Sequence, residues 1–171
     1  SVVRYGNVMG SRGSVIPFFM TQSERGVLPI TDTRMTRFMI TLEEGVDLVW
    51  HAFDDMEGGE IYVKKIPSMN ITDVALASVP GAKHEIIGIR PGEKLHEQMI
   101  GFEDAPHTYE YPEHYKILPA IHNWSQDKAR IKKGKLVHPD FTYASDNNAE
   151  WMSVEDLSNW IENNRAKIGK I

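Results

Sequence analysis

The sequence predicts a mixed α/β fold, and three observations support this prediction. Short runs of β-branched residues, such as Val2, Val3 and Val8, are typical of buried strands. Segments with helical spacing and clear start signals, one of them at Thr41, alternate with these runs. With 171 residues, of which 41% are hydrophobic, the chain is long enough to bury the core that such a fold needs.

The chain opens inside a predicted strand. Val2, Val3 and Val8 lie in it, and no turn or cap precedes Val2. Because a parallel strand needs neighbours on both sides, we expect part of the sheet to come from a segment upstream of Ser1. Further strands are predicted at residues 28–31, 35–40, 60–64, 84–90 and 115–118.

Two helices are predicted in the first third of the chain. Ser14 is placed to cap a helix that runs to about residue 23 and ends at Gly26. A capping box from Thr41 to Glu44 starts the second, which the glycine pair at 58–59 ends. Its apolar residues recur at helical spacing, as in an amphipathic helix: Leu42, Val46, Val49, Phe53 and Met56.

Further helices are predicted downstream. A short one begins at Asn70 or Thr72, and the turn at residues 91–97 is expected to lead into another. Residues 103–114 are acidic and aromatic, and we expect them to be irregular. Ser153 caps a last helix with one apolar face, formed by Val154, Leu157, Trp160 and Ile161.

Composition excludes several classes of partner. A net charge of −5 and a pI near 5.8 give no electrostatic footprint for nucleic acid. No stretch is long and apolar enough for a membrane span, and the start has no signal-peptide layout. Without cysteine there is no disulfide framework, so we expect a cytoplasmic protein that binds neither nucleic acid nor membrane.

Charged clusters elsewhere predict little chemistry. His107 and His114 stand among acidic residues, but prolines interrupt the stretch and no ligand spacing recurs, which favours a solvated loop over a metal site. The basic run at 128–135 has no interleaved aromatic residues and reads as a solvated face. His96 has no nucleophile beside it and is not a catalytic candidate.

Three glycines near the start raise the question of a nucleotide-binding loop. A dinucleotide fingerprint has the spacing G-x-G-x-x-G, with an acidic residue about 20 positions later. Here Gly6, Gly10 and Gly13 are spaced G-x3-G-x2-G, and Asp32 stands near Pro29 rather than at the end of a core strand. Spacing alone favours a strand that leaves a sheet through a loop in which glycine is required.

Ordered motifs along nearly the whole chain resemble one family. They are RYGNV at 4–8, GSRGSVIPFF at 10–19, LPITD at 28–32, MTRF at 35–38, GGEI at 58–61, KIPSM at 65–69, IRPGEKLHE at 89–97 and SDNN at 145–148. In these motifs the chain resembles the C-terminal half of the inverting UDP-N-acetylglucosamine 4,6-dehydratases. That family consists of extended short-chain dehydrogenase/reductases and makes bacterial surface sugars.

The resemblance implies an organisation in three parts. Residues 1–25 would end a Rossmann-like domain with its last sheet strand, 26–102 would form a small α/β substrate-binding domain, and 103–171 a C-terminal appendage. The family's glycine fingerprint and its Tyr-x-x-x-Lys helix have no counterpart here, since none of the 6 tyrosines has a lysine four residues later. We therefore expect no catalytic residue in this chain and no activity from it alone.

The resemblance also implies site residues. Its substrate-binding positions correspond to Asn7, Val15, Thr31, Arg37, Arg90 and Glu93. The backbone of the loop formed by Val8, Met9, Gly10, Ser11 and Arg12 would face NADP, held mainly by the upstream half, and no metal is implied. An arginine fork suits the phosphates of a UDP-sugar, and neutral amides suit its other groups.

Each of these positions has a structural alternative, and so has the function. Arg37 would otherwise pair with a surface carboxylate, Glu93 would be a first-turn acid on a helix, and Asn7 would cap a turn. A retaining 4,6-dehydratase, a 4-epimerase of the same superfamily or a non-catalytic sugar-nucleotide binding module are the alternative functions. The exposed edge of the opening strand predicts a homo-oligomer.

Overall fold

The computed structural model describes residues 1–170, without the side chains of residues 122 and 125. The helices are α1 (Val15–Thr21), α2 (Leu42–Asp55), α3 (Ile71–Ser78), α4 (Lys128–Ile131) and α5 (Val154–Asn164), and the 3-10 turns are η1 (Ser23–Arg25), η2 (Ala105–His107) and η3 (Ile121–Gln126). The strands are β1 (Val2–Arg4), β2 (Asn7–Val8), β3 (Val27–Ile30), β4 (Thr36–Ile40), β5 (Ile61–Lys64), β6 (Ser68–Asn70), β7 (Lys83–Ile86), β8 (Gln98–Ile100), β9 (Thr108–Glu110), β10 (His114–Ile117), β11 (Lys135–Leu136) and β12 (Tyr143–Ala144).

The strands form small sheets with mixed direction. The largest has the order β1-β5-β10-β9-β11, in which β1 is parallel to β5 and the other pairs are antiparallel. A second sheet has the order β2-β4-β6, and two-stranded sheets join β3 to β7 and β8 to β12. The pairs β2–β4 and β3–β7 are parallel, so the predicted α/β class is confirmed.

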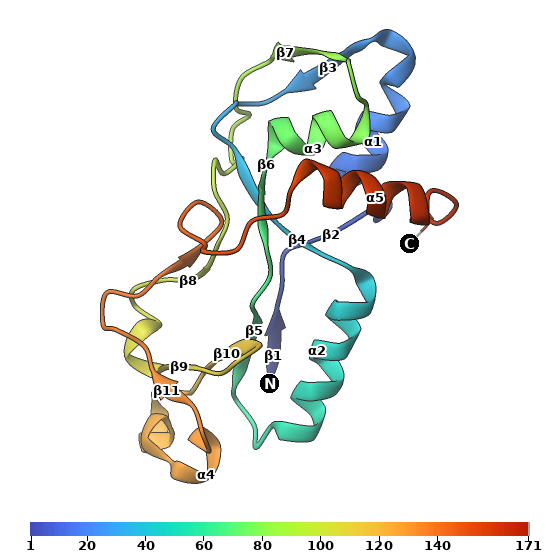
Figure 1. The fold of residues 1–171 in the computed structure, drawn as a ribbon. Coiled ribbons are helices and arrows are strands. Elements are labelled where there is room, and N and C mark those ends of the chain that lie inside the picture. The colour runs from blue at the N-terminus through green and yellow to red at the C-terminus, as the bar shows by residue number, and fades with distance from the viewer. Residues whose placement is uncertain (171) are drawn as a thin grey trace.

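The elements are arranged around two larger hydrophobic cores and a smaller cluster of Leu48, Ala52 and Tyr62 between α2 and β5 (Figure 1). Helices α1, α3 and α5 gather at one end with β3 and β7, and their core includes Phe19, Val74 and Leu157. The second core lies between β4, β5, β8 and β10. Strand β4 contributes side chains to both of these larger cores, because successive residues of a strand point to opposite faces. Met39 belongs to the first core and its neighbour Phe38 to the second.

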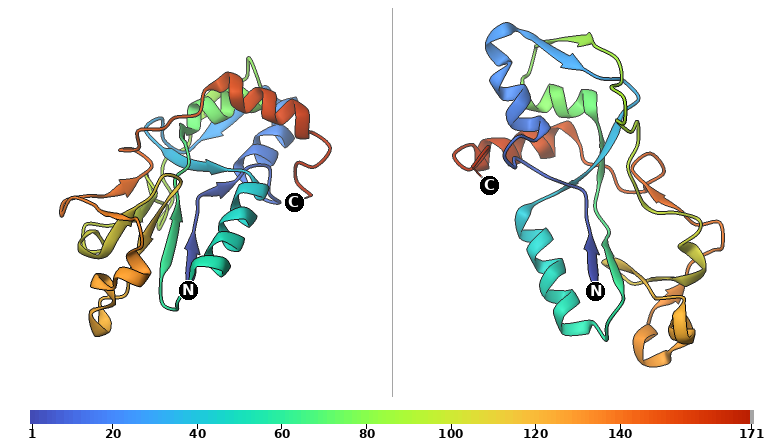
Figure 2. Two further views of the ribbon diagram at one scale, coloured as in Figure 1. Left: turned by 60° about the horizontal axis from the view of Figure 1, so that its bottom comes forward. Right: turned by 180° about the vertical axis from the view of Figure 1, so that it is seen from behind.

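The further views show α2 beside β1 and β5, running away from the end where α1, α3 and α5 gather (Figure 2). Pairing crosses the limits expected for the three parts of the chain, since β1 pairs with β5 and β5 with β10. The division at residues 25 and 102 stays a prediction.

The predicted capping box at Thr41 and the predicted helix cap at Ser153 are both confirmed. The Thr41 hydroxyl accepts from the Glu44 amide at 3.2 Å, and the Glu44 carboxylate accepts from the Thr41 amide at 2.9 Å. In α5 the Ser153 hydroxyl accepts from the Asp156 amide at 3.1 Å. Two orphan amides are satisfied at each start, which fixes where these helices begin.

The face that α2 buries differs from the amphipathic pattern expected from the sequence. Gly45, Leu48 and Ala52 are its buried residues, with the Tyr5 ring 3.7 Å from a Cβ added at Gly45. Small residues let the helix approach the sheet closely, and this decides which side packs inward. The exposed side, here called the apolar α2 face, consists of Leu42, Val46, Trp50, Phe53 and Met56, which are 41% to 63% exposed.

Two of the predicted strands need correction, and β9 lies in the segment 103–114 that was expected to be irregular. The opening strand is split into β1 and β2, with Gly6 between them against the backbone of Phe38. The strand expected at 84–90 is β7, which ends at Ile86.

The segment at 91–97 leads into strand β8 and not into a helix. The Leu95 carbonyl accepts from the Thr36 amide at 3.1 Å, and the Glu97 carbonyl accepts from the Ser145 amide at 2.8 Å. These partners are remote in sequence, and they hold the segment extended where local turn signals predicted a helix.

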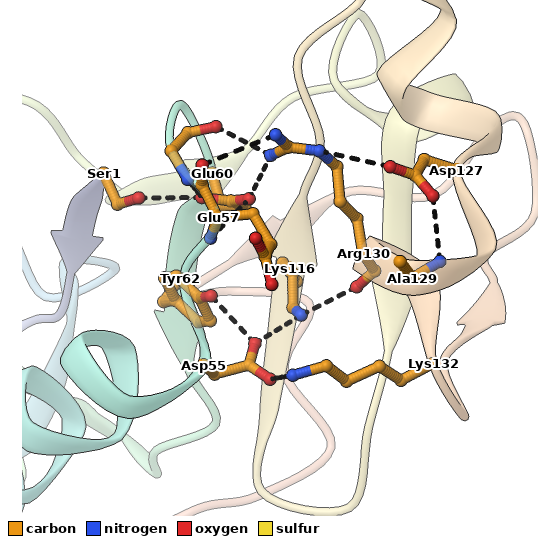
Figure 3. A network of polar contacts seen from close by, with 11 residues as sticks. Ser1, Asp55, Glu57, Glu60, Tyr62, Lys116, Asp127, Ala129, Arg130 and Lys132 are labelled. Carbon is orange, nitrogen blue, oxygen red and sulfur yellow. Dashed lines mark hydrogen bonds and ion pairs between the residues drawn. The ribbon is translucent and has the colours of Figure 1, made fainter.

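The basic run at 128–135 is also more than a solvated face (Figure 3). Arg130 is only 8% exposed, forms an ion pair with Glu60 and donates to the Gly58 carbonyl at 2.8 Å. Lys132 forms an ion pair with Asp55 at the end of α2. The run therefore fastens the α4 region to β5 and α2.

A buried lysine completes this polar network (Figure 3). The side chain of Lys116, 1% exposed, forms an ion pair with Asp55 and donates to the Arg130 carbonyl at 2.9 Å. Burial alone would raise the pKa of Asp55, but hydrogen bonds from Lys116, Lys132 and Tyr62 outweigh it and hold that pKa well below its ordinary value. Asp55 is therefore ionised in the folded protein at neutral pH.

Candidate functional site

The six residues assigned to substrate binding by resemblance all line one cleft of about 340 Å³. They are Asn7, Val15, Thr31, Arg37, Arg90 and Glu93. The remaining wall is mostly apolar and consists of Gly13, Phe18, Phe19, Pro29, Met35, Ile71 and Ile87. An apolar wall with a few convergent polar groups is typical of small-molecule sites.

The parallel pair β3–β7 builds one side of this cleft. The Ile87 amide continues the pairing beyond β7 by donating to the Ile30 carbonyl at 2.9 Å. This hydrogen bond places Thr31, which follows β3, beside the segment that carries Arg90 and Glu93.

The parallel pair β2–β4 and helix α1 build the other side. Asn7 opens β2 and pairs with Met39 of β4, and Arg37 lies two residues before Met39. Because residues two apart on a strand point to the same face, Arg37 and Met39 share a side of β4. Val15 opens α1, whose predicted cap Ser14 makes no side-chain hydrogen bond to the helix.

Arg37 is bound mainly to backbone carbonyl groups. Its guanidinium donates to the carbonyls of Thr36, Leu95 and Lys94 at 2.7, 3.1 and 3.0 Å. Its Nε lies 3.6 Å from the Glu97 carboxylate, and the side chain is 13% exposed. Sequence reasoning weighed a phosphate ligand against a surface ion pair, whereas the structure commits most of these N–H groups to holding the extended segment against β4.

Arg90 is the cation that stays available in the cleft wall. Among the described residues its guanidinium has no hydrogen-bond or ion-pair partner. The turn around it is closed by Glu93, whose amide donates to the Arg90 carbonyl at 3.0 Å and whose carboxylate accepts from the Arg90 amide at 3.3 Å. Since no helix follows this turn, the alternative role of Glu93 as a first-turn acid does not apply.

Glu97 is a cleft-adjacent residue to which sequence reasoning gave no role. With the Asn7 amide oriented to satisfy its neighbours, the side-chain nitrogen donates to the Glu97 carboxylate at 3.1 Å and to the Phe38 carbonyl at 3.3 Å. Burial raises the pKa of Glu97, although the charges of Arg37 and Lys94 oppose that shift. The one signal in the sequence was its place at the end of the IRPGEKLHE motif.

A second hollow of about 520 Å³ adjoins the cleft at Asn7. Its wall also contains Glu97 and the cations Arg4 and Lys94. Arg4 is committed in part, because it donates to the Met99 carbonyl at 2.8 Å. Asn7 therefore stands between two hollows, with the Glu97 carboxylate beside it.

The glycine loop is shaped largely by contacts inside the chain. Met9 is buried in the first core, and a Cβ added at Gly10 would lie 2.9 Å from the Trp160 ring. Gly6 packs against Phe38, whereas Gly13 faces open space with a φ of +75°. Close packing explains Gly6 and Gly10, and a left-handed backbone explains Gly13.

Two further sequence expectations concern metal and membrane. Among the described residues, no group of His, Cys, Asp and Glu side chains is arranged to hold a metal ion. The solvated loop expected around His107 and His114 is wrong, because residues 108–110 form β9 and His114 opens β10 with only 8% of its surface exposed. No helix in the described chain has the length and apolar character needed to cross a bilayer.

Comparison with known proteins adds family relationships to this geometry. The model of a family described as polysaccharide biosynthesis protein matches residues 1–119. The chain is 52% identical over 164 residues to a UDP-N-acetylglucosamine 4,6-dehydratase (inverting) of Campylobacter jejuni, an alignment that covers 92% of this chain and 49% of the relative. A UDP-glucose 4-epimerase of Rickettsia conorii is 44% identical over 121 residues, which is 68% of this chain and 36% of the epimerase.

The fold has a solved relative as well. The X-ray structure of Pen from Bacillus thuringiensis matches with a TM-score of 0.79 and 34% sequence identity, over 95% of this chain and 49% of that one. The chain thus spans about half the length of the curated dehydratases it matches, 49% in each case.

Proposed function

Because the chain belongs to the polysaccharide biosynthesis protein family, we propose that it forms the nucleotide-sugar-binding part of a UDP-N-acetylglucosamine 4,6-dehydratase that inverts C5. The observation that carries the proposal is the cleft in which all six positions assigned by resemblance meet. Identity of 52% to a dehydratase of that name supports the choice of substrate.

Arg90 has the leading role in the proposed site. Its guanidinium, which no described residue engages, offers two parallel N–H groups to a phosphate of the diphosphate, a geometry that lysine lacks. Glu93 keeps the turn closed so that Arg90 is held at the cleft. Val15 and Thr31 border the nucleotide, while Asn7 meets the sugar. Arg37 contributes a positive charge at short range, although its N–H groups are mostly engaged.

NADP is the proposed cofactor, and when bound it would supply hydride transfer to and from the sugar. Of the loop assigned to it, Ser11 and Arg12 are accessible, while Met9 and Gly10 are buried and would contribute backbone atoms only. This loop is therefore suited to contact one edge of NADP. We assign no acid or base to this chain; its residues bind and orient the sugar so that C5 and C6 face groups supplied by the rest of the enzyme.

A 4-epimerase is the second candidate, and the 44% identity to such enzymes favours keeping it. Both reactions begin from a bound UDP-hexose, so the cleft suits either one. A binding module without chemistry would use the same cleft. A cytoplasmic location and a homo-oligomeric state complete the proposal.

Calorimetric titration tests the binding part of the proposal. The chain should bind UDP-N-acetylglucosamine and UDP in competition with each other, whereas N-acetylglucosamine alone should give no signal. Absence of UDP binding would overturn the proposal. A marked preference for UDP-glucose would favour the epimerase.

Mass spectrometry tests the chemical part. With UDP-N-acetylglucosamine and NADP added, the chain alone should form no dehydrated 4-keto product. Repeated turnover by the purified chain would show that residues 1–171 contain the acid and base after all.

A further inference from the structure

Glu97 joins two residues of the cleft through its two carboxylate oxygens. Oε2 accepts from the Asn7 side-chain nitrogen at 3.1 Å, and Oε1 lies 3.6 Å from Nε of Arg37. The three residues come from β2, β4 and the segment before β8, so their contact exists only in the folded chain. The Glu97 side chain is about a third exposed, at 31%, and lines the second hollow.

This contact decides what Asn7 can offer to a ligand. A side-chain amide has two N–H donors and one carbonyl acceptor. In Asn7 both donors are taken, one by Glu97 and one by the Phe38 carbonyl at 3.3 Å. Only the carbonyl oxygen is left, so Asn7 can accept a hydrogen bond from a ligand but cannot donate one.

Without the carboxylate, the described residues offer no partner of comparable strength that distinguishes the two ends of this amide. The oxygen and nitrogen ends have nearly the same size, so a half-turn about the last side-chain bond costs little in packing. A hydrogen bond to a charged acceptor is stronger than one to a neutral acceptor, and it therefore favours a single orientation of the amide. The Phe38 carbonyl alone is a neutral and longer partner.

We propose that Glu97 is a positioning residue that fixes the Asn7 amide with its carbonyl oxygen available to a hydrogen-bond donor of the bound nucleotide-sugar, such as a hydroxyl or an amide N–H. The proposal rests on the proposed function for the identity of the ligand. The fixed amide favours ligands that donate a hydrogen bond to the Asn7 oxygen. It disfavours ligands that present only an acceptor there, because two facing acceptors would both lack a hydrogen bond.

The placement of Glu97 supports a role beyond structure. Burial raises the pKa of its carboxyl group, so the fold holds it in an environment that disfavours the charge. Arg37 from β4, Lys94 from its own segment and the Phe38 amide oppose that shift. Arg4 of β1 is a further cation in the wall of the same hollow.

The first experiment needs no ligand and observes the side-chain NH₂ resonances of Asn7 by NMR. They should titrate with Glu97, at a pH above the ordinary glutamate value of 4.5, and Glu97→Gln should abolish that titration. Glu113→Gln is the matched control, since Glu113 is 80% exposed and far from the cleft in the wall of another hollow. If the Asn7 resonances titrate in the same way in Glu97→Gln as in the unchanged protein, the proposal is wrong.

The second experiment measures the dissociation constant of UDP-N-acetylglucosamine. Glu97→Ala should weaken binding about tenfold, equivalent to about 1.4 kcal/mol. Glu97→Gln should retain most of the affinity, because its amide oxygen still accepts from Asn7. Equal affinity of Glu97→Ala and the unchanged protein would overturn the positioning role.

The two readouts separate the two proposals. If the unchanged protein does not bind the UDP-sugar, the proposed function fails, while the NMR titration still decides whether Glu97 orients Asn7. Should Glu97→Ala fail to fold, Glu97→Gln decides on its own through the loss or persistence of the Asn7 titration.

Discussion

Gly6 lies so close to Phe38 that a Cβ added at Gly6 would be 2.7 Å from the Phe38 carbonyl oxygen and nearer still to its Cβ. Phe38 is fully buried in the second core and cannot retreat. The contact lets β2 approach β4 closely enough to pair, and this pairing sets Asn7 against Glu97. A single glycine thus links packing to the geometry of the cleft.

Gly6→Ala should therefore destabilise the protein by about 3 kcal/mol, in the upper range for overpacking a core. Its control is Gly101→Ala, because a Cβ there would meet only the Gln98 side chain at 3.8 Å and the backbone is not left-handed. Chemical denaturation measures both, and we expect the control to change the free energy of unfolding by less than about 0.5 kcal/mol. Equal effects of the two variants would show that β2 can shift.

Removal of the buried cation at Lys116 should be costly. Lys116→Met deletes one partner of the Asp55 carboxylate, which stays partly buried with Lys132 and Tyr62 as remaining partners. Loss of one member of a buried ion pair costs about 3 kcal/mol or more.

The control for that change is Lys133→Met, an exposed residue in the same basic run. Chemical denaturation at neutral pH should give a clearly lower free energy of unfolding for Lys116→Met than for Lys133→Met. If Lys116→Met is as stable as Lys133→Met, then apolar packing replaces the ion pair without penalty.

Local signals predicted the fold where partners are near in sequence. Thr41 and Ser153 cap helices through residues three positions away, so both caps were predictable from the sequence. Two sides of α2 carry apolar residues, and only the sheet decides that Leu48 packs inward while Phe53 stays exposed. Leu95 is extended because it pairs with Thr36, a partner that no local pattern contains.

The site divides in the same way. Resemblance of motifs pointed to six positions that meet in one cleft, although nothing in their spacing predicted the meeting. The bonds of Arg37 to the Leu95 and Lys94 carbonyls were not predictable, because backbone acceptors leave no mark in a sequence. Glu97 was overlooked for the same reason, since its partner Asn7 is 90 positions away.

His114 should make stability fall in acid. Burial lowers its pKa to about 4 from 6.5, with the nearby His51, Lys116 and Lys64 adding to the shift and Asp55 opposing it. The unfolded chain therefore takes up the proton first as pH falls, and the free energy of unfolding drops between about pH 7 and pH 4, by at most about 3 kcal/mol from this group.

Replacement of the ring tests this assignment. His114→Phe keeps an aromatic ring to stack on Tyr111 but cannot titrate, so the dependence on pH should flatten. His138→Phe serves as the control, because His138 is 76% exposed and should leave the curve unchanged. If the free energy of unfolding of His114→Phe depends on pH as it does in the unchanged protein, other groups cause the loss of stability in acid.

The apolar α2 face should drive self-association. Trp50 and Phe53 are 63% and 59% exposed and lie 6.0 Å apart between ring centroids, on a side of the helix without a partner in the described chain. Large exposed apolar patches are typical of interfaces. Sedimentation velocity should show oligomers at micromolar concentration, and the double change Trp50→Glu with Phe53→Glu should dissociate them.

Phe102→Glu is the comparison for that experiment, since Phe102 is 65% exposed but belongs to a different region. It should leave the oligomers intact. A monomer at all concentrations in the unchanged protein would remove the homo-oligomer from the proposal.

Arg90→Lys should weaken binding of UDP-N-acetylglucosamine without a cost in stability. Lysine keeps the charge but cannot present two parallel N–H groups to a phosphate. In the described part of the chain, the Arg90 guanidinium holds no other side chain that its loss would release. We expect affinity to fall about tenfold, equivalent to about 1.4 kcal/mol, with the unfolding free energy unchanged. Arg34→Lys is the matched control, because Arg34 is 71% exposed and already pairs with Asp32. Equal affinities for the two variants would remove Arg90 from the site, and the cleft would then need another cation to hold a diphosphate.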